Sequence, residues 1–203
     1  MAILTVQTTG VNDTYMASID PTVNYGTDNG WAAGEDNTQV DQVSRALLKF
    51  DISSIPAGST INSAILTLTY RSDLSSNART LSVYRSLRAW IDTQATWNVY
   101  TTGNNWTSAG ANDTTNDREA TDIGNVTQPA SPTLDTTVDI TLTASKIQEM
   151  IAGGSFTNNG FVLRVDTETN DYISYHSTDG TTEAFRPKLV VTYIPPAGFF
   201  YLL

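Results

Sequence analysis

The residues that could do chemistry in this chain are few and scattered. His176 is the only histidine and there is no cysteine, so a cysteine nucleophile and a multi-histidine metal site are excluded. Asp166 and Glu168 lie two positions apart, which places both carboxylates on one face of a strand, as a pair of glycosidase acids requires. A solvated strand face in an acidic chain explains the same spacing. Because no cluster joins a nucleophile or base to a positioned acid, the sequence predicts that the protein is not an enzyme.

Three segments are rich in the oxygen ligands that Ca²⁺ prefers: Asp28-Asn-Gly30, Glu35-Asp-Asn37 and Asn112-Asp-Thr114. None has the spacing of an EF-hand, and turns closed by Asn and Asp side chains account for the same residues. A structural Ca²⁺ and ordinary turns are therefore both open, and no other cofactor is expected.

The tryptophans could fill a core or stack on sugar rings. Trp90 and Trp97 lie in strand-like surroundings, so we expect them to be structural. Trp31 follows an Asn-Gly dipeptide and Trp106 lies in an Asn-rich segment, so both are expected in loops. Trp31 and Trp106 are therefore the candidates for contact with a glycan.

Strands are the elements that would position these side chains. Alternation of apolar and polar residues predicts strands at residues 3–8, 46–52, 64–70, 81–84, 138–142, 161–165, 172–176 and 189–194. Gly, Asn, Asp and Pro between them supply the turns. Strands this frequent predict an all-β fold, a single antiparallel β-sandwich of the jelly-roll type with one short helix.

That helix is predicted at Lys146–Ile151, with Thr143 or Ser145 as its cap and Gly153 near its end. Its apolar face consists of Ile147, Met150 and Ile151. We expect it to lie across one end of the sandwich. The segment 101–132, rich in Asn, Asp, Thr and Gly, is expected to form surface loops that could carry a binding site.

Charge and length limit the partners. Eleven basic against twenty-one acidic residues give a net charge of −10, so the chain would repel a phosphate backbone and no nucleic-acid partner is expected. No apolar stretch has the length of a membrane span, and residues 1–10 show no export signal. With Met1 at its start, the chain is expected to be a complete product made in a cytoplasm.

The C-terminal end differs from the rest. Residues 1–194 are predicted to form the sandwich, and Pro195 and Pro196 stop its last strand. Residues 195–203 are predicted to be a tail whose apolar end is Phe199, Phe200, Tyr201, Leu202 and Leu203. Such an end would dock onto another subunit or copy, or fold back over the protein's own sheet edge.

Several motifs occur together in a specific order. They are the run from Arg45 to Ala64 (Arg-Ala-Leu-Leu-Lys-Phe-Asp-Ile-Ser-Ser-Ile-Pro-Ala-Gly and onward), the earlier Asn24-Tyr-Gly26, and the later Tyr84-Arg85, Thr96-Trp-Asn98, Asn158-Asn-Gly-Phe161 and Arg186–Tyr193. Over residues 11–193 this pattern resembles the DNRLRE domain family, also called disaggregatase-related. The resemblance implies a jelly-roll sandwich in which Arg45 and Arg186 are scaffold residues that satisfy carbonyls or carboxylates. It also implies, for some members, carbohydrate binding, alginate included, although few Lys and Arg residues are present here to bind a polyuronate.

Two functions from different classes follow. The first is a structural protein on a virion surface, such as a phage head-decoration or fibre protein. Its C-terminal segment would dock onto capsid subunits, onto subunits of the phage tail or onto another copy of the chain. The protein would leave the host cell with the particle. This function reconciles a mostly extracellular family with a chain that shows no export signal. The second is a secreted carbohydrate-binding module that uses Trp31 and Trp106.

Overall fold

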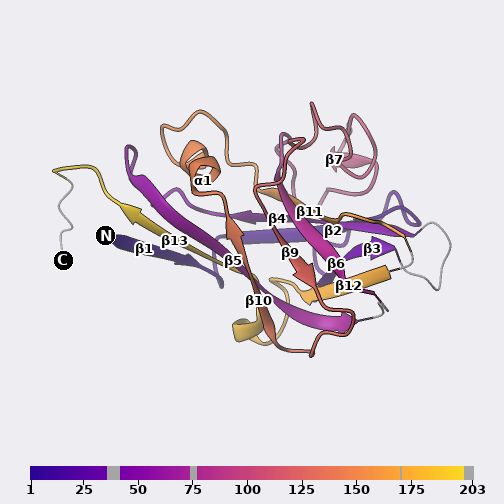
Figure 1. Cartoon of the computed structure of the whole chain (residues 1–203). Coiled ribbons are helices and arrows are strands. Elements are labelled where there is room, and N and C mark those ends of the chain that lie inside the picture. The colour runs from indigo at the N-terminus through magenta and orange to yellow at the C-terminus, as the bar shows by residue number, and fades with distance from the viewer. Residues whose placement is uncertain (36–41, 74–76, 170, 199–203) are drawn as a thin grey trace.

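The computed structural model describes residues 1–35, 42–73, 77–169 and 171–198 (Figure 1). The helices are α1 (Ala144–Met150) and a short 3₁₀ helix, η1 (Glu183–Phe185). The strands are β1 (Ala2–Val6), β2 (Val11–Ala17), β3 (Gly30–Glu35), β4 (Val43–Phe50), β5 (Thr60–Asp73), β6 (Arg79–Arg85), β7 (Val99–Thr101), β8 (Asn104–Asn105), β9 (Gly124–Gln128), β10 (Thr137–Leu142), β11 (Phe161–Val165), β12 (Asp171–His176) and β13 (Lys188–Ile194). The all-β prediction with one short α-helix is confirmed.

The long strand β5 joins the two halves of a sandwich. Its first part pairs with β13 and β10, and its end pairs with β12, where a bulge at Ser174 and Tyr175 shifts the register. Antiparallel pairing continues in the order β1-β13-β5-β12-β3-β4-β11-β6-β9, and β2 adds along β4. One antiparallel sheet therefore curls so that its two halves enclose a core (Figure 1).

Alternation explains the strands that the sequence predicted. In β13, Leu189, Val191 and Tyr193 are buried in the core while the residues between them are not. All eight predicted strands occur, within a few residues of their expected bounds. β2, β3, β9 and the short strands β7 and β8 were missed. In β3, five of the six residues are buried, so both faces are covered and no alternation is visible.

Helix α1 begins one residue after Thr143, which is the N-cap but makes no side-chain capping hydrogen bond. Ser145 lies inside the helix. Ile147, Met150 and Ile151 are buried as predicted. Gln148 fixes the helix to the start of β5, because its amide oxygen accepts from Ile61 N–H at 2.7 Å and its amide nitrogen donates to the Ser59 carbonyl at 2.7 Å.

The segment between β6 and β9 forms a folded cap on the outer surface of the sheet. A second apolar cluster packs Trp90 and Trp106 of this cap against Leu47 of β4 and Val162 of β11. Asp117, which is fully buried, accepts the backbone N–H groups of Thr107 and Ser108, both at 2.9 Å. The prediction that residues 101–132 are surface loops is confirmed for most of this segment, but it missed β8, β9 and the buried side chains of Trp106 and Asp117.

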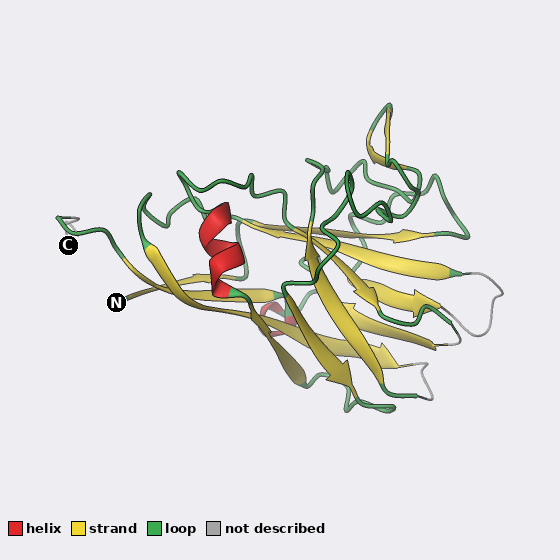
Figure 2. Cartoon of the chain, turned by 45° about the horizontal axis from the view of Figure 1, so that its top comes forward, coloured by secondary structure: helices red, strands yellow, loops and turns green. Residues whose placement is uncertain are grey.

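The longer loops and the β7–β8 hairpin lie above the strands in Figure 2, and shorter connections lie below them. Within the described ranges, no helix has the length and apolar character needed to cross a lipid bilayer.

Candidate functional site

The two tryptophans expected to contact a glycan do not present a free ring. Trp31 is 1% exposed and packs in the main core against Tyr175, with ring centroids 4.6 Å apart. Trp106 is 4% exposed, and its indole N–H donates to the Thr96 carbonyl at 3.0 Å. The prediction of exposed stacking platforms is wrong for both, because Gly30 opens strand β3 and Trp106 lies inside the folded cap. Trp90 is buried in the same cap, as expected.

The remaining candidates for chemistry are separated from one another. His176 contacts Asp135 through Nε2 at 2.9 Å and packs on the Phe185 ring. Asp166 accepts from the Ser82 hydroxyl at 3.0 Å, whereas Glu168 is bound to arginines. Asp166 and Glu168 therefore have different hydrogen-bond partners, and the Glu168 carboxylate is already bound by two arginines.

The oxygen-rich segments are used within the chain where they are described. Asn29 accepts from Arg71, Asn112 accepts from Arg164, and Asp113 accepts the N–H groups of the turn that follows it. Asp36 and Asn37 lie outside the described residues, as does the predicted docking end at 199–203. Among the described residues, no three His, Cys, Asp or Glu side chains come together as a metal site.

An arginine cluster lies beside the cap, on the outer surface of β4, β6 and β11. Arg45 of β4 donates to Glu168 through Nε at 2.7 Å and through Nη2 at 2.8 Å, a bidentate pair. Its Nη1 donates to the Gly110 carbonyl of the cap at 2.7 Å. Arg164 of β11 donates to the same Glu168 at 2.8 Å and to Asn112 at 2.9 Å. One carboxylate is thus shared by two guanidinium groups.

Arg118, at the end of the cap, is the third member of the cluster. Its guanidinium carbon lies 4.3 Å from the centroid of the half-buried Tyr84 ring. The residue is 6% exposed, and its one protein acceptor within the described chain is the Glu119 carbonyl, 3.0 Å from Nη1. Its Nε is buried with no acceptor in that part of the chain. Arg118 therefore carries a charge that the protein solvates poorly.

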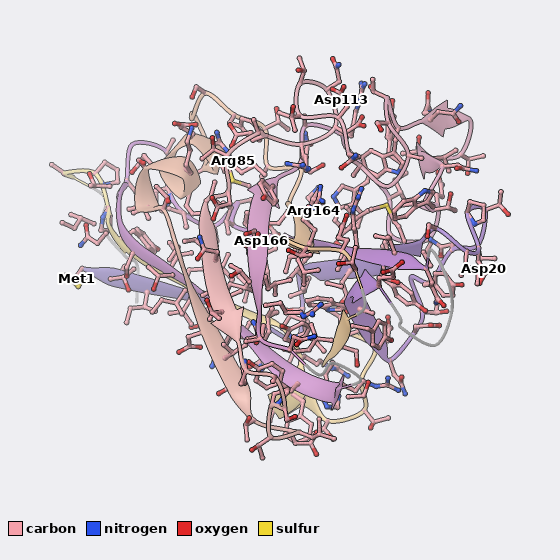
Figure 3. The ribbon with its side chains drawn as sticks, turned by 45° about the vertical axis from the view of Figure 1, so that its right-hand side comes forward. Met1, Asp20, Arg85, Asp113, Arg164 and Asp166 are labelled. Atoms are coloured by element: carbon pink, nitrogen blue, oxygen red, sulfur yellow. The ribbon has the colours of Figure 1, made fainter. Side chains whose placement is uncertain are left out.

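The arginine cluster, here Arg45, Arg118 and Arg164, has more positive than negative charge. Glu168 and the more exposed Asp166 are the acidic neighbours of Arg164. Burial lowers the pKa of Arg118, and repulsion from Arg164 and Arg45 lowers it further. Burial and the Arg45 charge likewise lower the pKa of Arg164. An added negative charge would relieve the repulsion among these guanidinium groups. In Figure 3, Arg164 and Asp166 lie near the middle of this face, below the loop that carries Asp113.

Arg85, which lies outside the arginine cluster, holds helix α1 in place. Arg85, 1% exposed, pairs with Glu119 at 2.6 Å and with Glu149 of α1 at 2.7 Å. Its guanidinium lies 3.8 Å from the Phe156 ring centroid. Arg186 donates to the Gly180 carbonyl at 2.9 Å. Arg45 and Arg186 therefore do satisfy carboxylates and carbonyls, as the resemblance implied, while Arg85 links the cap to α1.

Sequence reasoning missed Arg118, Arg164 and Tyr84 as a group. They come from three segments far apart in the chain, and Arg118 lies in a segment without periodicity. A partial signal existed for Arg164, because the alternating strand 161–165 places it opposite its apolar neighbours.

The fold and this site define a single β-sandwich, in an acidic chain, with a cluster of mostly buried arginines beside its cap. The family model described as the disaggregatase related repeat domain matches residues 14–191. The chain therefore belongs to this family, the one that the sequence motifs indicated, and the family suggests a module of the carbohydrate-binding kind. No curated protein matches the chain.

Proposed function

We propose that this protein is a non-catalytic carbohydrate-binding module for an acidic glycan, whose carboxylates bind Arg118 and Arg164. The observation that carries the proposal is Arg118, a buried guanidinium with one protein acceptor and an unpaired Nε in the described chain. The family's carbohydrate-binding character supports it. The chain has only eleven basic residues, but three of them meet in one place and can bind an acidic glycan there.

A uronate would supply what the cluster lacks. Its planar carboxylate can accept N–H groups from two guanidinium groups at once, and charge-assisted hydrogen bonds of this kind are worth about 1.5–3 kcal/mol each. Tyr84, half-buried beneath Arg118, adds a ring edge and a hydroxyl beside the same position. The site would therefore combine a charge for specificity with the edge of an aromatic ring.

The net charge of −10 opposes the approach of a polyanion. At physiological ionic strength, however, charges more than about 8 Å away are largely screened. The local excess of positive charge then decides binding, and the opposing long-range repulsion slows association more than it weakens the complex.

The test compares oligogalacturonate with its methyl ester, which has the same backbone without the charge. Calorimetry should show binding of the acid form that weakens as NaCl is added, and little binding of the ester. Arg118→Met and Arg164→Met should each weaken binding by about ten- to a hundredfold. Arg71→Met is the matched control, since Arg71 is an exposed arginine of β5 bound to Asn29, and it should change nothing.

Equal affinity for the ester and the acid, or wild-type affinity in both cluster variants, would overturn the proposal. So would a lack of binding to oligogalacturonate, oligoalginate and oligoglucuronate alike. Melting temperatures of the variants show whether a loss of binding reflects a loss of fold. The virion-surface function rests on residues 199–203, and no described residue favours it.

A further inference from the structure

A hollow of about 700 Å³ lies away from the arginine cluster, at the opposite end of β4 from Arg45. Three segments form it: Gly10 of the β1–β2 turn with Asn12 of β2, Lys49 of β4 with Asp51 just after it, and the loop after α1 with Phe156 and Asn158. Its size lies in the range of pockets that bind small molecules.

Part of the lining of the hollow is apolar. Ile52, Met150 and Ile151 line it and are each about 3–4% exposed. Phe156 also lines it, half-buried, and the Arg85 guanidinium covers one face of its ring. These groups offer a surface for the C–H face of a ring rather than for a charged group.

The walls are fixed in advance by hydrogen bonds between elements. Asp51 N–H donates to the Gly10 carbonyl at 2.6 Å, and Asn158 Nδ2 donates to the Phe50 carbonyl at 2.8 Å. Gly160 adopts φ +77°, and a Cβ there would lie 2.6 Å from the Leu48 carbonyl oxygen, so only glycine lets this loop approach β4 so closely. A preformed wall lowers the entropic cost of binding.

Two charged groups of opposite sign, Lys49 and Asp51, also line the hollow, and each can form further hydrogen bonds. Asp51 Oδ1 accepts the Ser53 N–H at 2.9 Å, which leaves further lone pairs on its carboxylate. Hydrogen bonds from Ser53 lower the pKa of Asp51, so it is ionised at neutral pH. The Lys49 ammonium has no hydrogen-bond acceptor within the described ranges, and its charge acts on Asp51. A donor and an acceptor side by side, with no net charge, match adjacent hydroxyl groups.

We infer that this hollow is a second ligand site, which binds a pyranose of a neutral glycan. Adjacent hydroxyls bridge Lys49 and Asp51, and the C–H face of the sugar lies on the apolar part of the lining. The site differs from the arginine cluster in both position and ligand charge, and its occupancy does not depend on an acidic glycan being bound.

The experiment measures binding of neutral trisaccharides by saturation-transfer NMR, with maltotriose, cellotriose, mannotriose and triacetylchitotriose as probes. At least one should bind, and Lys49→Met and Asp51→Asn should each weaken it at least about tenfold. Asp51→Asn can still accept from Ser53, and Lys49→Met keeps the aliphatic stem, so both variants should fold. Lys188→Met, a lysine of β13 outside the hollow, is the matched control and should bind normally.

Arg118→Met separates this inference from the proposed function, since it should weaken oligogalacturonate binding by about ten- to a hundredfold while leaving binding of the neutral probe unaffected. The inference is overturned if none of the four probes binds at about 10 mM, near the weak limit for a specific sugar site. It is equally overturned if a probe binds but Lys49→Met and Asp51→Asn, both folded by melting temperature, retain wild-type affinity.

Discussion

Asp13 of β2 is a carboxyl group whose burial should be visible in the pH dependence of stability. Its side chain is 3% exposed and accepts two hydrogen bonds from Thr178, from the N–H at 2.8 Å and from the hydroxyl at 2.9 Å. These bonds favour the ionised form, but burial outweighs them. Burial, with a smaller contribution from Asp179 and Asp92, raises the pKa of Asp13 from 3.8 to about 7.

The direction and size of the effect follow from linkage. Because the folded pKa lies above the unfolded one, the stabilisation from Asp13 is complete below about pH 4 and is lost as the pH rises through about 7. One pKa unit corresponds to about 1.4 kcal/mol. Between about pH 4 and pH 8, the free energy of unfolding should therefore fall by about 4 kcal/mol from this group alone.

Asp13→Asn isolates the term, because an amide can keep both contacts with Thr178 and carries no charge at any pH. In urea unfolding measured across this pH range, the variant should gain stability relative to the wild type as the pH rises. Asp113→Asn is the control of opposite sign. Hydrogen bonds from the Thr115 and Asn116 N–H groups lower the pKa of Asp113, so its contribution is lost as the pH falls. If the difference in the free energy of unfolding between the wild type and Asp13→Asn stays constant with pH, Asp13 does not have a raised pKa in the folded state.

Three further changes test the packing and the docking segment. Trp31→Ala should lower the free energy of unfolding by about 3–5 kcal/mol in urea titrations, through a cavity in the main core, and a loss below about 1 kcal/mol would place this ring at the surface. Asp117→Ala leaves buried N–H groups of the cap without an acceptor. The amides of Thr107 and Ser108 should therefore lose hydrogen-exchange protection, while the amides of β13 keep theirs. Unchanged protection of Thr107 and Ser108 would show that other contacts hold the cap. Deletion of residues 199–203 should leave the melting temperature unchanged and abolish self-association in light scattering, whereas a lower melting temperature without a change in mass would indicate a tail that covers its own sheet edge.

Periodicity predicted most of the fold because most strands have one face on the core and one in water. The same physics explains the failures. β3 is buried on both faces, and its Gly-Trp-Ala-Ala-Gly run shows no alternation. Trp31 was therefore assigned to a loop on the strength of the preceding Asn-Gly dipeptide, although Gly30 begins the strand. Trp106 was misplaced for a related reason, because a polar segment can fold into a cap when a buried carboxylate such as Asp117 organises its backbone.

The candidate site could not be predicted from the sequence, for a different reason. A count of basic residues averages over the whole chain, whereas binding depends on where they meet. Arg45, Arg118 and Arg164 are brought together by strand pairing and by the cap, and neither the register of β11 on β4 nor the path of the cap is encoded in a local pattern. The motif around Arg45 indicated a scaffold role, which its bonds to Glu168 and Gly110 bear out, and gave no sign of its neighbours.

The most direct test of the central claim follows the arginine Nε–H signals by NMR during titration with oligogalacturonate. The buried Nε–H of Arg118 should exchange slowly and give its own resonance. We expect the Arg118 and Arg164 signals to shift in a saturable manner with the acid and not with its methyl ester. The Arg85 signal should not shift, because Arg85 is already bound to Glu119 and Glu149. Saturation of the protein with oligogalacturonate while the Arg118 and Arg164 signals remain unmoved would contradict it.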